Sequence, residues 1–146
     1  MNREQELLQQ VLRIATAGRK FFTTVTPTIV DVEVRSAFDY IAEVKTRLIG
    51  DITPWVREPA ADAPQHVSAA VSVEKTYADL ERTFRRDPPA ASARLLAIGE
   101  EQLLRTVERT FEESRIPVLK DLLKTYYPQL VICREAMTRL RSREAA

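Results

Sequence analysis

The stretch Ile116–Leu140, IPVLKDLLKTYYPQLVICREAMTRL, carries the clearest structural pattern in this chain of 146 residues. Its apolar residues recur in alternating steps of four and three, the spacing of one buried seam along a helix. The seam residues are Leu119, Leu123, Tyr126, Leu130, Cys133, Met137 and Leu140. A helix with one such seam must bury it against other helices, so the pattern predicts an all-α protein.

The rest of the chain supplies helices that match this one. Seams with the same spacing predict helices over residues 3–24, 31–53, 68–85 and 88–114, and the final helix begins at Pro117. Four of the five are long and one is short, and strand patterns are absent from the sequence. The prediction is a single domain over residues 1–146, an antiparallel four-helix bundle with the short helix in the connection between the second and fourth helices.

Residues with strong positional preferences mark the helix ends. Asn2 is the expected cap of the first helix, and Gln5 stands where a capping box needs it. Asp87 followed by Pro88 is typical of a helix start, because aspartate caps well and proline suits the first turn. Pro128 lies inside the final helix, where the seam continues on both sides. We therefore expect a kink at Pro128 rather than an end.

Composition excludes several classes of function. The chain has 22 basic and 21 acidic residues, a net charge of +1, and acidic residues are interleaved with its arginines, so we expect no nucleic-acid partner. No apolar run approaches the roughly 20 residues that span a bilayer. The charged N-terminus does not look like a signal peptide, and one cysteine cannot form an internal disulfide. These features favour a cytoplasmic protein.

Charged residues interrupt three of the predicted seams. Arg19, Lys45 and Glu100 each lie near the middle of a helix, and Tyr126 lies on the last helix at about the same level. Because an unpaired buried charge is costly, we hypothesise a polar core layer with an Arg19–Glu100 ion pair, to which Lys45 or Tyr126 adds hydrogen bonds. In the alternative, each side chain extends its charged end to solvent from the seam edge.

Four-helix bundles often hold two metal ions, and the sequence can be tested for such a site. The di-metal site needs a Glu from each of two helices and a Glu-x-x-His unit from each of the other two. The single histidine, His66, has Ala63 three residues before it, so neither unit exists. We therefore expect no metal cofactor, and Glu100 and Glu43 are the remaining candidates for an all-carboxylate site.

Other reactive side chains have structural interpretations. His66 is expected in an exposed loop, within a Pro- and Ala-rich segment that includes 57–64. Cys133 reads as a small core residue, because a cysteine nucleophile needs a base nearby and the histidine is distant in sequence. A pocket for an apolar ligand is a further alternative, for which the candidate residues are Tyr126, Tyr127, Trp55 and Met137.

Several short stretches resemble an uncharacterised bacterial family of ferritin-like four-helix-bundle proteins, known as a domain of unknown function. The resemblance covers roughly residues 5–142. Its stretches are Ala17–Phe22, Val34–Ile52, Tyr77–Glu81, Gly99–Glu101 and Ile116–Pro117. It implies a ferritin-like fold and, by ancestry, metal or oxygen chemistry. The family carries a glutamate after the helix-1 glycine, where this chain has Arg19, whereas Glu100 matches the helix-4 glutamate.

The sequence thus favours a non-catalytic bundle, a structural or protein-interaction module without a working di-metal site. The alternative is a metal–carboxylate protein that binds iron or manganese through glutamates. We expect a protein partner or a homo-oligomer, because the first helix has a second apolar stripe that something must cover. The residues of this stripe are Leu7, Ile14, Phe21 and Val25.

Overall fold

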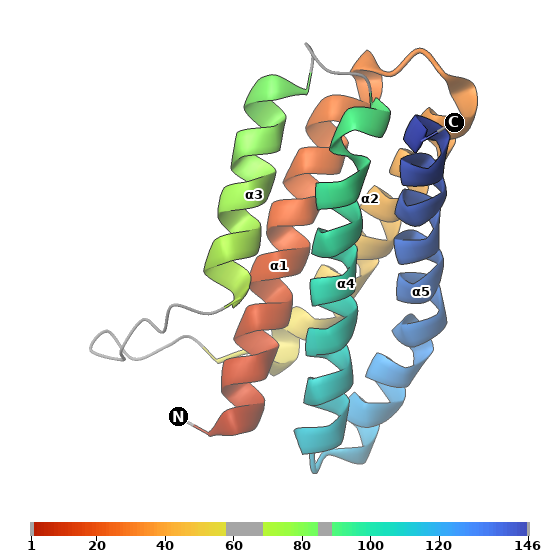
Figure 1. Ribbon diagram of the computed structural model, residues 1–146. Helices are drawn as coiled ribbons and strands as arrows, with labels where there is room; N and C mark the ends of the chain where they lie inside the picture. Colours follow the sequence, from red (N-terminus) through yellow and green to blue (C-terminus); the bar gives the residue numbers. More distant parts are fainter. Residues whose placement is uncertain (1, 58–68, 85–88, 146) are drawn as a thin grey trace.

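The computed structural model describes residues 2–57, 69–84 and 89–145, and within these ranges it contains helices and no strand (Figure 1). This confirms the all-α class. The elements are α1 (Arg3–Val25), η1 (Thr26–Thr28), α2 (Val32–Ile52), η2 (Thr53–Trp55), α3 (Ala69–Thr83), α4 (Pro89–Glu113) and α5 (Pro117–Ala145), where η marks a short 3₁₀ helix.

The five α-helices lie side by side with their axes roughly along one direction (Figure 1). α1 packs against α2, α3 and α4, and α5 packs against α4 and α2. α3 makes its main contacts with α1 and α4, so it lies along the outside of these two helices. In the view of Figure 1 the chain rises along α1, α3 and α5 and descends along α2 and α4.

The seam predicted for the last helix is buried along its whole length. The most exposed of its seven residues is Leu140, at 6%. α5 continues without interruption through Pro128, and its axis changes direction in its lower half (Figure 1). The helix bends near Pro128 but does not end there, because buried apolar residues on both sides of the proline keep the two parts packed as one helix.

The start of α1 is capped by Asn2 as expected, but the capping box predicted for Gln5 does not form. The backbone N–H of Gln5 donates to Asn2 Oδ1 over 2.8 Å. The Gln5 side chain does not return to the cap; its Nε2 donates to the Trp55 carbonyl over 3.1 Å, and its Oε1 accepts from the Arg57 N–H over 2.9 Å. The start of α1 is thereby tied to the chain that follows α2.

The second apolar stripe of α1 is covered within the chain. Leu7, Ile14, Phe21 and Val25 are all at most 3% exposed. α3 lies alongside α1, where the Phe21 ring packs against the rings of Tyr77 and Phe84, with centroids 5.6 and 5.5 Å apart. The stripe therefore gives no reason for self-association, because a short helix of the same chain fulfils that need.

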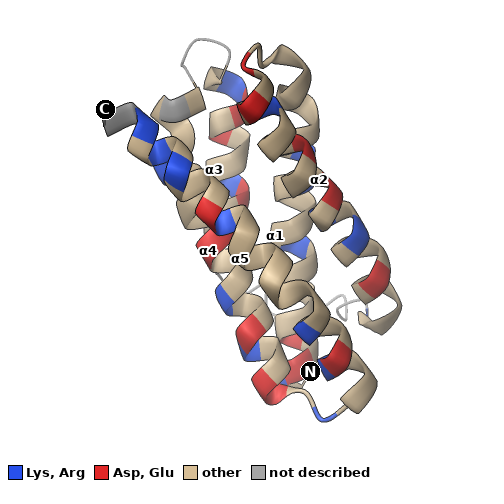
Figure 2. Cartoon of the chain, turned by 90° about the vertical axis from the view of Figure 1, so that its right-hand side faces the viewer, with Lys and Arg blue, Asp and Glu red and all other residues tan. Residues whose placement is uncertain are grey.

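Charges of both signs occur on the same helices (Figure 2). Lys and Arg residues gather toward the C-terminal end of α5, where Arg143 pairs with Asp31 over 3.1 Å. No helix within the described ranges is long and apolar enough to cross a membrane. Three predictions lie outside the described residues: the helix start at Asp87–Pro88, residues 58–64 of the loop, and the exposed position of His66.

Candidate functional site

The centre of the molecule contains a buried ion pair between two long helices. Lys45 of α2 and Glu100 of α4 are joined by a 2.6 Å contact from Nζ to Oε1. Their side chains are 0% and 1% exposed. Since desolvating two charges costs several kcal/mol per ion, such a pair persists only where each charge has partners in good geometry.

A tyrosine from α3 engages the second carboxylate oxygen. The Tyr77 hydroxyl donates to Glu100 Oε2 over 3.0 Å, so both oxygens of the carboxylate have a donor. Burial raises the pKa of Tyr77 well above its usual range, and the charge of Glu100 and the hydrogen bond to it raise it further. The hydroxyl therefore keeps its proton and acts as a donor.

Two glycines make room for this cluster. A Cβ built on Gly18 of α1 would lie 2.5 Å from Lys45 Cε and 3.4 Å from Tyr77 Cζ. A Cβ built on Gly99 of α4 would lie 2.7 Å from the Tyr77 hydroxyl oxygen. Side chains at these positions would occupy the space of Lys45 and Tyr77. The glycines thus allow α1 and α4 to approach the two polar side chains closely.

An aromatic ring and a thiol also lie near the pair. Lys45 Nζ lies 5.5 Å from the centroid of the Phe22 ring of α1, within range of a cation–π contact. Cys133 of α5 is buried close enough to interact electrostatically with both Lys45 and Glu100. Each of the five helices therefore contributes to the cluster, which we call the central cluster: Gly18, Phe22, Lys45, Tyr77, Gly99, Glu100 and Cys133.

The structure brings together two of the four residues predicted for the polar core layer. Lys45 and Glu100 pair, but the expected Arg19–Glu100 pair is wrong, because Arg19 is only partly buried and Lys45 takes the carboxylate. The seam of α1 takes a three-residue step from Ala15 to the buried Gly18. Arg19 consequently lies at the seam edge, as the solvent-facing alternative requires.

Tyr126 also differs from the hypothesis. It is 5% exposed, and its hydroxyl donates to a carboxylate oxygen of Asp51 at the end of α2 rather than to Glu100. Burial and the hydrogen bond to Asp51 raise the pKa of Tyr126 to about 12. Tyr126 thus joins α5 to α2 away from the central cluster. Of the other aromatic candidates for an apolar pocket, Tyr127 is 42% exposed and Trp55 is half-buried.

The residues proposed for a carboxylate metal site are not brought together. Glu100 is buried with both oxygens engaged, whereas Glu43 is exposed on α2. In the part of the chain that the structure describes, no three His, Cys, Asp or Glu side chains cluster in a way that could hold a metal ion. The Lys45 ammonium instead supplies the positive charge beside the Glu100 carboxylate.

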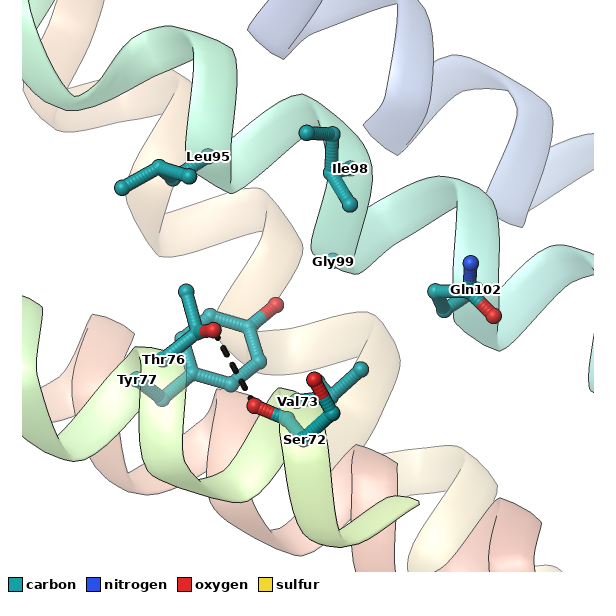
Figure 3. Close-up of a pocket in the computed structure, with 8 residues that line it drawn as sticks. All are labelled: Ser72, Val73, Thr76, Tyr77, Leu95, Ile98, Gly99 and Gln102. Atoms are coloured by element: carbon teal, nitrogen blue, oxygen red, sulfur yellow. Dashed lines mark hydrogen bonds between the residues drawn. The ribbon is translucent and has the colours of Figure 1, made fainter. Parts of the chain in front are cut away.

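A small surface cavity of about 160 Å³ lies between α3 and α4, next to the central cluster (Figure 3). Tyr77 and Gly99 line its inner part, and Figure 3 shows the tyrosine ring reaching from α3 toward α4 with its hydroxyl on the Gly99 side. Leu95 and Ile98 of α4 border it and are 42% and 46% exposed. The cavity ends at the tyrosine that covers the ion pair, and Tyr77 itself is only 3% exposed.

Tyr77 and the two glycines were not recognised from the sequence as parts of a site. Tyr77 fits the apolar seam of its helix, so the pattern predicts a core residue and gives no sign of a polar role for its hydroxyl. A usable signal existed: Gly18, Tyr77, and Gly99 with Glu100 all lie in the stretches that carry the family resemblance. A glycine inside a long helix is unfavourable by about 1 kcal/mol relative to alanine, so it can mark close packing, as it does at Gly18 and Gly99 but not at Gly50.

Comparison with known proteins adds no relative. No family model, no curated protein and no solved structure matches this chain.

The buried Cys133 thiol leads to a pH-dependent prediction. Burial raises its pKa from 9.0 to about 12, with Lys45 opposing and Glu100 adding to the shift. Because the folded-state pKa is raised, the stabilisation is fully present below pH 9.0 and is lost as the pH rises toward about 12. Between pH 9 and 10 the thiol alone should lower the free energy of unfolding by about 1 kcal/mol. Buried tyrosines with raised pKa values add to the fall over the same interval, so the contribution of the thiol is read from the difference between two proteins.

Urea denaturation at pH 8, 9 and 10 measures this effect, with Cys133→Ala as the matched variant. We expect a smaller fall in the variant over the same interval. Equal falls in the two proteins would show that the thiol does not titrate with a raised pKa in the folded state.

Proposed function

We propose that this chain is a ferritin-like antiparallel four-helix bundle whose centre holds an internal ion pair where a related bundle would bind metal. It acts as a non-catalytic structural or protein-interaction module. The observation that carries the proposal is the central cluster, in which Lys45 and Tyr77 together engage both oxygens of Glu100. The family resemblance supports two further proposals, a bacterial source and a cytoplasmic location.

The packing of the long helices supports the bundle assignment. α1 contacts α2 and α4, and α5 contacts the same two helices, so the four can be arranged in a ring of neighbours. Chain directions along α1, α2, α4 and α5 alternate around this ring (Figure 1). α3 then corresponds to the extra short helix predicted in the connection between the second and fourth helices, α2 and α4.

The residues at the centre do not fit a di-metal cofactor. Two bridged cations need several carboxylates and histidines directed inward. Here the inward carboxylate, Glu100, faces a lysine at 2.6 Å, and a metal ion beside that ammonium would meet like-charge repulsion. The lysine therefore takes over the charge-balancing role of a metal, and the cluster serves packing rather than redox chemistry.

Exposed apolar side chains support action through the surface. α4 and α5 together present Leu95, Ile98, Val118, Tyr127 and Ile132, each at least 42% exposed. Leu95 and Ile98 lie beside the cavity between α3 and α4. Apolar side chains that gather near a groove are typical of protein-binding surfaces, and a protein partner or a second copy of the chain would cover them.

Metal analysis of the untagged protein, expressed with added iron and manganese, tests the proposal. We expect plasma mass spectrometry to find the same background metal content in the wild type, Glu100→Ala and Glu43→Ala. Near-stoichiometric iron or manganese that is lost in Glu100→Ala would overturn the proposal in favour of the metal–carboxylate alternative.

A further inference from the structure

α3 differs from the other helices in its place in the fold. It has 15 residues, the smallest number among the described α-helices, and it lies along the outside of α1 and α4. Its inner face is a single apolar stripe of buried residues. The stripe comprises Ala70, Val73, Tyr77, Leu80 and Phe84, the last of these just beyond the helix end.

Among the described residues, side chains form two polar contacts between α3 and the long helices. Tyr77 donates to Glu100 in the interior, and Arg13 of α1 pairs with Glu74 on the surface. Both partners of the surface pair are at least 36% exposed, so this pair contributes little. The Tyr77 hydroxyl, which passes between Gly18 and Gly99, is therefore the main polar contact that holds α3 in register.

The surface beneath α3 combines apolar residues with a buried ion pair. A purely apolar surface would be strongly disfavoured in water, but departure of α3 would also uncover the Lys45–Glu100 pair beneath Tyr77. Hydration of this pair would offset part of the lost apolar burial, because buried charges regain solvation when water reaches them. The cavity between α3 and α4 reaches Tyr77 and Gly99, so Tyr77 separates it from the pair (Figure 3).

We propose that α3 is a releasable strap with Tyr77 as its latch. It opens as one unit while α1, α2, α4 and α5 stay packed. Opening uncovers the α1–α4 face for a partner, which would be an amphipathic helix that carries a tyrosine in the pattern of α3. The closed strap is an autoinhibitory contact, because α3 itself occupies that face. This inference rests on the proposed interaction function and names the surface it uses.

Native-state hydrogen exchange of the full chain, read by mass spectrometry at increasing urea concentration, tests the strap. In the wild type we expect the amides of α3 to share one opening constant, larger than that of the slowest amides in α4 and α5. Tyr77→Phe removes a hydrogen bond to a charged group and should raise the α3 exchange rate roughly 10- to 100-fold. Tyr127→Phe, at an exposed tyrosine of α5, should change nothing.

A second variant separates local opening from global unfolding. Leu123 of α5 is 1% exposed, and the main contacts of α5 are with α2 and α4. Leu123→Ala should accelerate the exchange of amides that open only by global unfolding roughly thirtyfold or more. It should leave the exchange of α3 unchanged, because Leu123 stays packed in both the closed and the strap-open state, so the variant destabilises both states equally. If α3 and α5 accelerate together in Leu123→Ala, α3 opens only by global unfolding and the strap is overturned.

A labelled peptide of residues 69–84 probes the uncovered face directly. It should bind the full-length Tyr77→Phe protein about tenfold more tightly than the wild type, because the open state is more populated there. A peptide with its own Tyr77→Phe change should bind more weakly. Absence of saturable binding to the Tyr77→Phe protein would overturn the assignment of this surface. Neither result depends on metal content, so failure of the strap and failure of the proposed function are distinguishable.

Discussion

Replacing Lys45 by methionine should lower the free energy of unfolding by about 3–5 kcal/mol. Methionine fills a similar volume but leaves the Glu100 carboxylate, 1% exposed, without its cation. A buried charge whose partner has been removed keeps its desolvation cost and loses the attraction that compensated for it. Urea denaturation at pH 7, followed by circular dichroism, measures the loss.

Lys20→Met is the matched control, because Lys20 is an exposed lysine of α1. Its effect should stay within about 0.5 kcal/mol, as for most surface substitutions. If Lys45→Met were as mild as Lys20→Met, the ammonium would not be compensating a buried charge, and the buried ion pair would be refuted.

The three glycines of the chain should respond to alanine with opposite signs. Each lies inside a helix, where alanine is favoured over glycine by about 1 kcal/mol. A Cβ at Gly50 meets nothing within 4 Å, so Gly50→Ala should stabilise the protein by about 0.5–1 kcal/mol. Gly18→Ala and Gly99→Ala should destabilise it by about 1–3 kcal/mol, because the added methyl overpacks a filled interior.

The neighbours at the two buried glycines cannot yield easily. The methyl at Gly18 would lie 2.5 Å from Lys45 Cε, on a side chain held at its end by Glu100. The methyl at Gly99 would meet the hydroxyl of a rigid ring at 2.7 Å. Comparison of the three unfolding midpoints provides its own control. Stabilisation by alanine at all three positions would mean that the central cluster is looser than the structure shows.

Helix positions were predictable because they depend on local periodicity. The seam of the last helix recurs often enough to define its buried face, and all seven of its residues are buried. Asn2 was identified as a cap from its type and position. The Gln5 side chain was not assigned correctly, because its partners Trp55 and Arg57 lie some fifty positions away in the sequence and become neighbours only in the fold.

The central cluster could be predicted only in part. Lys45 and Glu100 break clear seams, so burial was one of the two interpretations that their spacing allowed. Their pairing did not, because a seam position fixes the face of a helix but not the distance across the core. Arg19 was chosen as the partner because steps of three and four are both allowed from Ala15, and the chain takes the shorter step to Gly18.

The position of α3 was the least predictable feature with functional meaning. The apolar seam of α3 needed a surface to pack against, and the second apolar stripe of α1 needed a cover. The sequence does not show that these two surfaces pack against each other. An intermolecular cover satisfied the same pattern. Once α3 is placed on α1, Tyr77 reaches Glu100, and the polar character of the site follows from that contact.

A double-mutant cycle between Lys45 and Glu100 tests the central claim most directly. The quantity is the difference between the loss in Lys45→Met/Glu100→Met and the sum of the losses in the two single variants. We expect the double variant to retain at least about 2 kcal/mol more stability than the sum predicts, because each single variant leaves one buried charge without a partner and the double variant leaves none. Strictly additive losses would show that the two side chains do not interact in the folded protein.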